Sequence, residues 1–197
     1  MIHFLHIPKT GGTTLRAHLD NEHALSHHAV KSIAEIPPSD LDTSICSGHY
    51  HFLGPEHRYI TILRHPIKRV TSLYHFIMRS PRHYLYNEIK HLTLEKFCKE
   101  KYYETRDWQT RIISGTVERD LDLAKHNIEQ FFLEAGTTCE FTSSMERLKK
   151  LLKWHDVPSY RLNATKYPEP TTAERRAIAR NNHKDMKLFE WVKERNK

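Results

Sequence analysis

One stretch near the N-terminus combines residue types that bind phosphate. Residues 4–15 read FLHIPKTGGTTL, which predicts a short buried strand, a tight turn at two glycines and the start of a helix. The N–H groups and the dipole at a helix N-terminus favour negative charge, and the lysine beside the turn adds a full positive charge. We therefore expect a phosphate-bearing cofactor to bind the loop Pro8, Lys9, Thr10, Gly11, Gly12, Thr13 and Thr14.

The order of residues in this loop differs from that of a Walker A motif. A Walker A motif has Lys and then Ser or Thr after its second glycine, whereas Lys9 precedes both glycines here. The sequence also has no apolar strand that ends in an obvious Walker B aspartate. A phosphotransferase or kinase with an atypical phosphate loop is therefore an alternative rather than the first hypothesis.

A second pair of residues suited to an oxyanion follows the clearest predicted strand. Arg64 ends the apolar run at residues 59–64, and Ser72 lies two turns into a helix that starts at Pro66. The two side chains could face one oxyanion, because a guanidinium is well shaped for phosphate. The alternative is that Arg64 forms a structural ion pair and Ser72 packs in the core.

Together these motifs resemble those of the sulfotransferases that use 3′-phosphoadenosine 5′-phosphosulfate (PAPS). Residues 8–14 resemble the family's 5′-phosphosulfate loop, and Arg64 with Ser72 resembles its 3′-phosphate motif. The chain is most similar to the heparan sulfate 2-O-type carbohydrate sulfotransferases and their small bacterial relatives. In that family a Gly-His element precedes the strand that ends in the arginine, and Gly48-His49 matches it. Looser matches follow at residues 121–125, 136–141 and 162–165.

The resemblance implies that a sulfonate passes from PAPS to an acceptor hydroxyl by in-line displacement, with no metal. It implies that His49 is the general base, and the pKa of histidine suits this role near neutrality. His51 is its partner or substitute, although packing near a strand end is an equal alternative for that residue. Lys9 and the loop N–H groups would stabilise the charge on the leaving phosphate. Arg64 and Ser72 would hold the 3′-phosphate.

Two further sets of residues are candidates for the rest of the site. The family often closes the cofactor site with a late loop, and the candidates for it are Asn163, Thr165 and Lys166. Candidates for the acceptor side are Trp108, Gln109 and Arg111, with core packing as the alternative for Trp108. The expected acceptor is a carbohydrate or another small hydroxylated molecule, and an anionic glycan would suit a basic protein.

The predicted elements alternate between strands and helices along the chain. Strands are expected at residues 2–7, 29–30, 45–47, 59–64 and 136–141. Helices are expected at residues 13–21, from 66 onward, and at 94–101, 120–132, 143–154, 171–181 and 184–195. With the resemblance, this order predicts a P-loop-NTPase-like three-layer α/β fold, in which a central, mainly parallel sheet is flanked by helices.

This fold predicts where the candidate groups lie. Residues 9–14, His49 and Arg64 all fall beyond the carboxyl ends of strands, where such folds bind ligands. Residues 80–108 have no clear period and are expected to form an insertion or lid that faces the substrate. We expect residues 1–197 to form a single domain.

The composition bears on the other classes of function. The net charge of +7 indicates anionic partners, so a non-enzymatic polyanion-binding protein is a third hypothesis. Nucleic acid is not expected as a partner, because basic and aromatic residues do not interleave at a regular spacing. The three scattered cysteines, the lack of a signal-peptide pattern and the lack of an apolar run of about 18 residues predict a cytoplasmic protein without a membrane segment.

Overall fold

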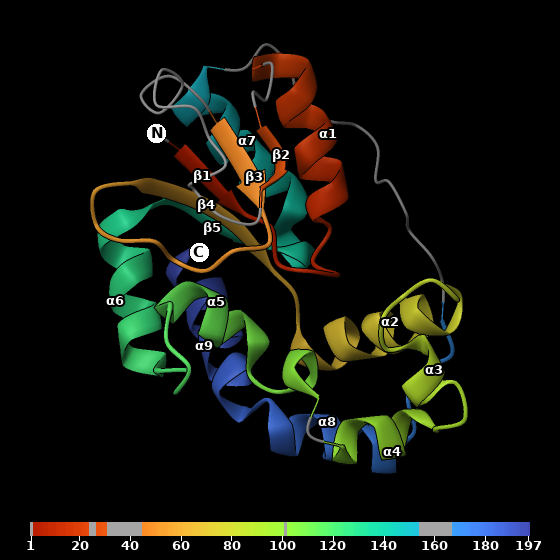
Figure 1. Cartoon of the computed structure of the whole chain (residues 1–197). Coiled ribbons are helices and arrows are strands. Elements are labelled where there is room, and N and C mark those ends of the chain that lie inside the picture. The colour runs from red at the N-terminus through yellow and green to blue at the C-terminus, as the bar shows by residue number, and fades with distance from the viewer. Residues whose placement is uncertain (1, 24–26, 31–44, 101, 154–166) are drawn as a thin grey trace.

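A central parallel sheet organises the protein. The computed structural model describes residues 2–23, 27–30, 45–100, 102–153 and 167–197. Five strands form the sheet in the order β2-β3-β1-β4-β5 (Figure 1). They are β1 (Ile2–Leu5), β2 (His27–Val30), β3 (Ile45–Gly48), β4 (Arg58–Leu63) and β5 (Phe132–Thr137). Because every strand pair is parallel, the carboxyl ends of all these strands lie at one edge of the sheet.

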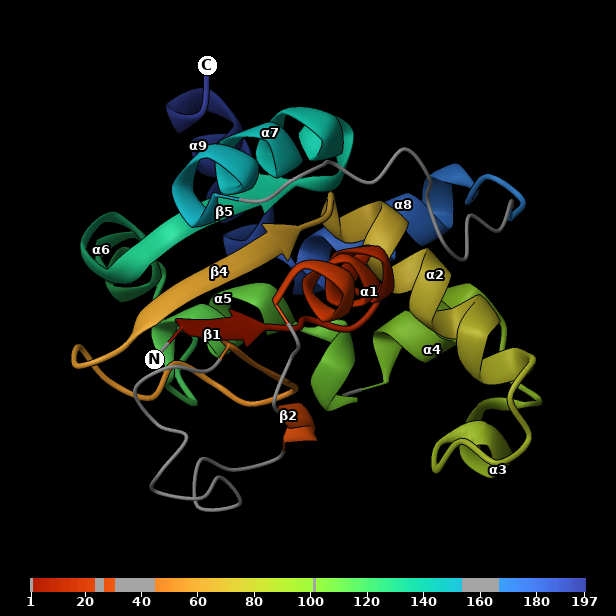
Figure 2. The same ribbon diagram turned by 90° about the horizontal axis from the view of Figure 1, so that it is seen from above.

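Helices cover both faces of this sheet (Figure 2). In the described residues they are α1 (Gly12–His23), α2 (Pro66–Met78), α3 (Tyr86–Ile89), α4 (Leu94–Lys99), α5 (Trp108–Ser114), α6 (Leu121–Phe131), α7 (Phe141–Leu152), α8 (Thr172–Asn181) and α9 (His183–Arg195), with the short 3₁₀ helices η3 (Tyr103–Thr105) and η4 (Thr138–Glu140). The apolar residues of α1 and α7 pack on one face of the sheet, and those of α5, α6 and α9 pack on the other. The predicted three-layer α/β arrangement is therefore confirmed.

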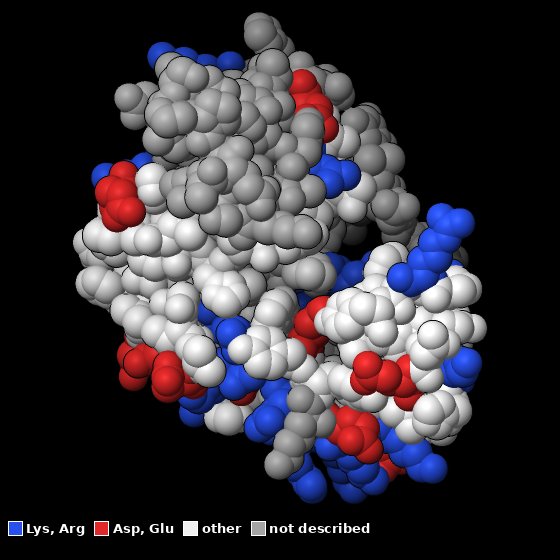
Figure 3. Space-filling view, viewed as in Figure 1, with Lys and Arg blue, Asp and Glu red and all other residues white. Residues whose placement is uncertain are grey.

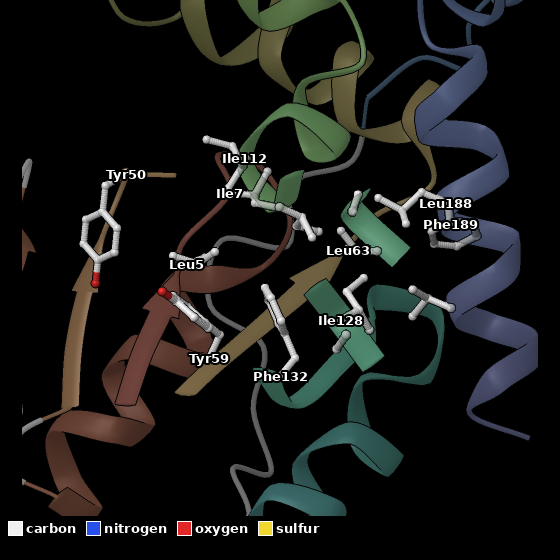
Figure 4. Packing of buried hydrophobic residues seen from close by; sticks show 14 of the residues in the cluster. Leu5, Ile7, Tyr50, Tyr59, Leu63, Ile112, Ile128, Phe132, Leu188 and Phe189 are labelled. Atoms are coloured by element: carbon white, nitrogen blue, oxygen red, sulfur yellow. The ribbon is translucent and has the colours of Figure 1, made fainter. Parts of the chain in front are cut away.

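Strand β4 shows how both layers share one strand. Alternate side chains of a strand point to opposite faces, so Tyr59 and Leu63 join the cluster of α5, α6 and α9, whereas Ile60 and Ile62 join the cluster of α1 and α7. All four side chains are fully buried. Figure 4 shows the first of these clusters, in which Tyr59 lies beside Leu5 of β1 and Phe132 of β5. Burial on both faces explains why this strand is a continuous apolar run in the sequence.

A third apolar cluster lies beyond the sheet and is built from α2, α3, α4 and α8 (Figure 1). Its buried members include Leu73, Leu85, Phe97 and Ile178. Leu85, Ile89, Leu94 and Phe97 of the segment at residues 80–108 therefore pack in one cluster with α2 and α8. Among the described residues, no helix has the length and hydropathy needed to span a bilayer.

The edge strand β5 lies earlier in the chain than the sequence predicts. Residues 136–141 were expected to be the strand, but β5 ends at Thr137 and the chain then enters η4 and α7. The strand carries a buried carboxylate, Glu134, which breaks its apolar pattern. Its partner is Arg147 of α7, which donates two hydrogen bonds of 2.9 and 2.7 Å to the Glu134 carboxylate.

Residues 143–146 and 171–174 both have the sequence spacing of a capping box, which predicts a helix start at each. Helix α7 begins at Phe141 with no side-chain cap, so the box predicted at residues 143–146 is wrong. At α8 the side chain of Thr171 accepts from the Glu174 N–H, and the Glu174 carboxylate accepts from the Thr171 N–H, as predicted.

Two buried aspartates join α5 to α9. Asp185 accepts hydrogen bonds from the N–H groups of Gln109 (3.1 Å) and Thr110 (2.7 Å) and from the Thr110 hydroxyl (2.8 Å). Asp107, which directly precedes α5, accepts from the N–H groups of Lys184 and Asp185, each at 2.9 Å. Each helix start is thus capped by a carboxylate that belongs to the other helix.

We predict that Asp185→Ala lowers the free energy of unfolding by roughly 3 kcal/mol or more, because each buried donor left unsatisfied costs about 1–3 kcal/mol. Urea denaturation followed by circular dichroism measures this loss. Glu129→Ala, an exposed carboxylate on α6, is the matched control and should change stability by no more than about 0.5 kcal/mol. Equal denaturation midpoints for Asp185→Ala and the control would contradict the structural role of the two aspartates.

We also predict a loss of stability in acid that depends on His3. This side chain is fully buried, and burial is the main cause that lowers the pKa of His3 from 6.5 to about 3. Because the folded-state pKa lies below the unfolded value, His3 contributes stability that is complete above pH 6.5 and is lost as the pH falls toward 3. The unfolding free energy of the protein should therefore fall more steeply below pH 6 than that of His3→Phe, by up to about 1.4 kcal/mol per pH unit. Parallel pH profiles for the two proteins would contradict the prediction.

Candidate functional site

The phosphate-type loop connects β1 to α1 by a turn with left-handed residues. Lys9 and Gly11 have φ angles of 70° and 83°. The Thr10 hydroxyl donates to the Ile7 carbonyl (2.8 Å), and the Thr14 N–H donates to the Gly11 carbonyl (3.1 Å). The first N–H groups of α1 have no partner within the helix, which makes its start suitable for an anion. The loop therefore has the local form that the sequence predicts.

Gly12 is required by a close contact with His6. A Cβ atom at Gly12 would overlap the imidazole ring of His6. Burial is the main cause that lowers the pKa of His6 to about 3, and the nearby His49 and Lys9 lower it further. His6 is therefore a neutral ring at neutral pH, packed under the start of α1.

Arg64 is held at the end of β4 by Gln109 of α5. The Gln109 side chain accepts from the Arg64 N–H and donates to the Arg64 carbonyl, each at 2.9 Å. The Arg64 guanidinium donates to the Lys9 carbonyl (3.0 Å) and so ties β4 to the phosphate-type loop. Gln109 is fully buried, so it positions Arg64 instead of lining the acceptor side.

Three cations lie close together around the loop. The Lys9 ammonium lies 4.1 Å from the centre of the Phe76 ring on α2. Burial is the main cause that lowers the pKa of Lys9, and the charges of Arg64 and Arg79 lower it further. In the described ranges, none of the three cations forms an ion pair with a carboxylate. The space-filling view shows Lys and Arg atoms in a hollow between the sheet and helices α2 to α4 (Figure 3).

Further polar groups on one face of α2 lie near Lys9 and Arg64. The hydroxyl of Tyr167 accepts from Arg79 (3.1 Å) and lies 3.5 Å from the Ser72 hydroxyl, and its ring stacks on His75 with the centroids 4.9 Å apart. Tyr167 also acts electrostatically on both Lys9 and Arg64. The structure thus brings Ser72, Arg64 and the loop together as expected.

The sequence reasoning missed Arg79, His75 and Tyr167. Arg79 lies seven residues after Ser72, which is two helical turns on the same face, and this spacing could have identified it. Tyr167 carried no such signal, because its contact with α2 spans 95 residues of sequence. The predicted cofactor-site residues Asn163, Thr165 and Lys166 lie outside the described residues.

His49 follows β3 and lies beside the loop with an exposed side chain. Its Nδ1 is hydrogen-bonded to the His6 carbonyl, and the two rings are 4.6 Å apart. A carbonyl only accepts, so Nδ1 carries the proton and the Nε2 of a neutral His49 has a free lone pair. This tautomer is the one that a general base with Nε2 as its proton acceptor requires.

His51 lies against α5 instead. Its ring is edge-on to Trp108 with the centroids 6.3 Å apart. Burial is the main cause that lowers the pKa of His51, and the charge of Arg111 lowers it further. Among the described residues, no group of three or more His, Cys, Asp or Glu side chains could hold a metal ion.

The fold, but no family, is identified by comparison with known proteins. No protein-family model matches the sequence, and no curated protein matches it significantly. Among solved structures, the chain is similar to a sulfotransferase from Alicyclobacillus acidocaldarius, with a TM-score of 0.54 and 14% sequence identity over 97% of this chain and 94% of that one. The protein therefore has the P-loop-like α/β fold of that sulfotransferase.

Proposed function

We propose that the protein is a PAPS-dependent sulfotransferase that transfers a sulfonate to an acceptor hydroxyl. The observation that carries this proposal is the group of three cations, Lys9, Arg64 and Arg79, which have no carboxylate partner among the described residues. Lys9 and Arg64 are half-buried and Arg79 is exposed beside them. Gathering like charges around half-buried groups is unfavourable unless an anion joins them. A strongly anionic ligand would supply the opposite charge.

Two separate phosphate positions favour PAPS over a nucleoside triphosphate. The first is the start of α1 with Lys9, where backbone N–H groups and an ammonium would hold the phosphosulfate. The second is the face of α2 with Ser72 and Arg79, which would hold the 3′-phosphate. Arg64 lies between them, because its guanidinium bonds to the Lys9 carbonyl and its charge interacts with Tyr167. A cofactor with phosphates on both sides of one ribose fits this pair of positions.

The remaining groups would carry the chemistry of an in-line displacement. His49 Nε2 would take the proton of the acceptor hydroxyl as the new oxygen–sulfur bond forms. The bond between sulfur and the bridging oxygen of the donor breaks in the same step. Lys9 and the N–H groups at the start of α1 would stabilise the negative charge that collects on that oxygen. The His6 carbonyl would keep the His49 ring in the tautomer that this step needs.

The first test is calorimetric binding of three ligands: 3′-phosphoadenosine 5′-phosphate (PAP) without metal, ATP with Mg²⁺, and an oligonucleotide. PAP should bind most tightly. Arg79→Gln should weaken PAP binding by roughly 10- to 100-fold, since a charged hydrogen bond contributes about 1.5–3 kcal/mol. Arg176→Gln, which removes an exposed arginine of α8, is the matched control and should leave PAP affinity unchanged.

Two results would contradict the proposal. A preference for ATP with Mg²⁺ would indicate a phosphotransferase. Tight binding of the oligonucleotide without binding of PAP would indicate a polyanion-binding protein.

We further predict that His49→Ala lowers kcat by roughly 10²- to 10⁴-fold with PAP affinity unchanged, because it removes the base but no phosphate contact. The assay uses radiolabelled PAPS with an acceptor selected by screening hydroxylated compounds. His126→Ala, an exposed histidine of α6, controls for loss of an imidazole elsewhere. Full activity of His49→Ala together with an inactive His51→Ala would assign the base to His51.

A further inference from the structure

We propose that Arg111, together with the ring of Tyr103, forms a second anion site that binds a carboxylate or sulfate group of the acceptor. The site is separate from the three cations beside the phosphate-type loop. The inference rests on the proposed function in taking the ligand to be the acceptor. It identifies the acceptor as a molecule that carries an anionic group in addition to the hydroxyl that reacts.

The first observation is the environment of the Arg111 guanidinium. The residue is only 6% exposed, and its Nε and Nη1 atoms are buried without a hydrogen-bond partner. It forms no ion pair with a carboxylate in the part of the chain that the structure describes. A buried charged donor with no acceptor is unfavourable, and an anionic group of a ligand would satisfy it.

Two other arginines of the core, Arg147 and Arg69, each have an acceptor within the fold, although Nε and Nη1 of Arg69 are buried without a partner as in Arg111. Arg147 forms a two-bond pair with the Glu134 carboxylate. Arg69 is fully buried, but it donates to the Glu104 carbonyl (2.6 Å) and lies in the field of Asp185. Among the described residues, the Arg111 guanidinium has no hydrogen-bond acceptor or carboxylate partner, and it lies against the rings of Tyr103 and Trp108.

The second observation is that this aromatic environment opens to the surface. The Arg111 guanidinium lies 3.9 Å from the centre of the Tyr103 ring and 5.5 Å from that of Trp108. Tyr103 is 49% exposed, and a second guanidinium, that of Arg119, lies 5.7 Å from the centre of its ring. An exposed ring between two guanidiniums offers a flat stacking surface beside positive charge.

The third observation places this site on the acceptor side of the candidate base. Arg111 acts electrostatically on His51, which lies two residues after His49. The Phe52 N–H donates to the Ile112 carbonyl (2.8 Å), and this bond holds the chain after His49 against α5. Arg111 therefore lies next to the segment that carries the histidines. The 3′-phosphate position is instead built by α2.

The test uses three sugars that differ at one position: methyl glucuronide, methyl glucoside 6-sulfate and neutral methyl glucoside. We expect the two charged sugars to shift the Arg111 side-chain N–H resonances in NMR titrations, and the neutral one to leave them unchanged. In the assay, kcat/KM should favour a charged sugar over the neutral one by about tenfold or more, as expected for one charged contact. The charged sugar with the higher kcat/KM shows whether the site prefers a carboxylate or a sulfate.

Variants separate this role from a structural one. Arg111→Gln should abolish the preference for charged sugars while PAP affinity stays unchanged, and Arg111→Lys should restore part of the preference without restoring the aromatic stacking. Arg106→Gln, which removes a charge next to η3, is the matched control and should retain the preference. A preference that survives in Arg111→Gln, or charged sugars that leave the Arg111 resonances unshifted, would overturn the inference.

The same measurements distinguish this inference from the proposed function. Failure of the unaltered protein to bind PAP would overturn the proposed function, while the NMR titration would still decide whether Arg111 binds anions. Binding of PAP with equal turnover of all three sugars would overturn the anion site alone.

Discussion

The pairing of the Gln109 side chain with both backbone groups of Arg64 is the interaction on which the candidate site depends. A parallel strand that ends inside the protein leaves an N–H and a carbonyl without partners, and burying them unpaired is costly. The Gln109 amide satisfies both at 2.9 Å. It thereby fixes the direction in which the Arg64 side chain leaves β4, and that side chain in turn holds the Lys9 carbonyl.

A chain of hydrogen bonds connects this pairing to the C-terminal helix. Asp185 of α9 bonds to the Gln109 N–H, Gln109 bonds to Arg64, and Arg64 bonds to Lys9. The position of the phosphate-type loop is therefore linked to residues that are far away in the sequence. These bonds join the start of α5 and the packing of α9 to the position of the Arg64 side chain.

How well the sequence predicts each part depends on whether the signal is local. Apolar runs, the Gly11-Gly12 turn and the Thr171 capping box are local patterns, and β1, β4, the loop and the start of α8 follow from them. The position of β5 did not follow, because Glu134 looks polar until its partner Arg147 is known. The sequence also did not predict the roles of Gln109 and Tyr167, because their partners lie 45 and 95 residues away in the chain. Patterns along the chain report burial, but they do not report which distant group satisfies a buried polar atom.

The charge of the protein becomes informative only when its cations are sorted by their partners. A net charge of +7 fits many functions, and most exposed lysines and arginines contribute only to a solvated surface. Arg147 is neutralised within the fold by Glu134. Lys9, Arg64 and Arg79 lack a carboxylate partner in the described ranges, and so does Arg111. Lys9, Arg64 and Arg79 lie beside the phosphate-type loop, whereas Arg111 lies beside Tyr103 and near His51. Under the proposed function, the donor and the acceptor are both anionic, so each of them would be held by its own cations while they react.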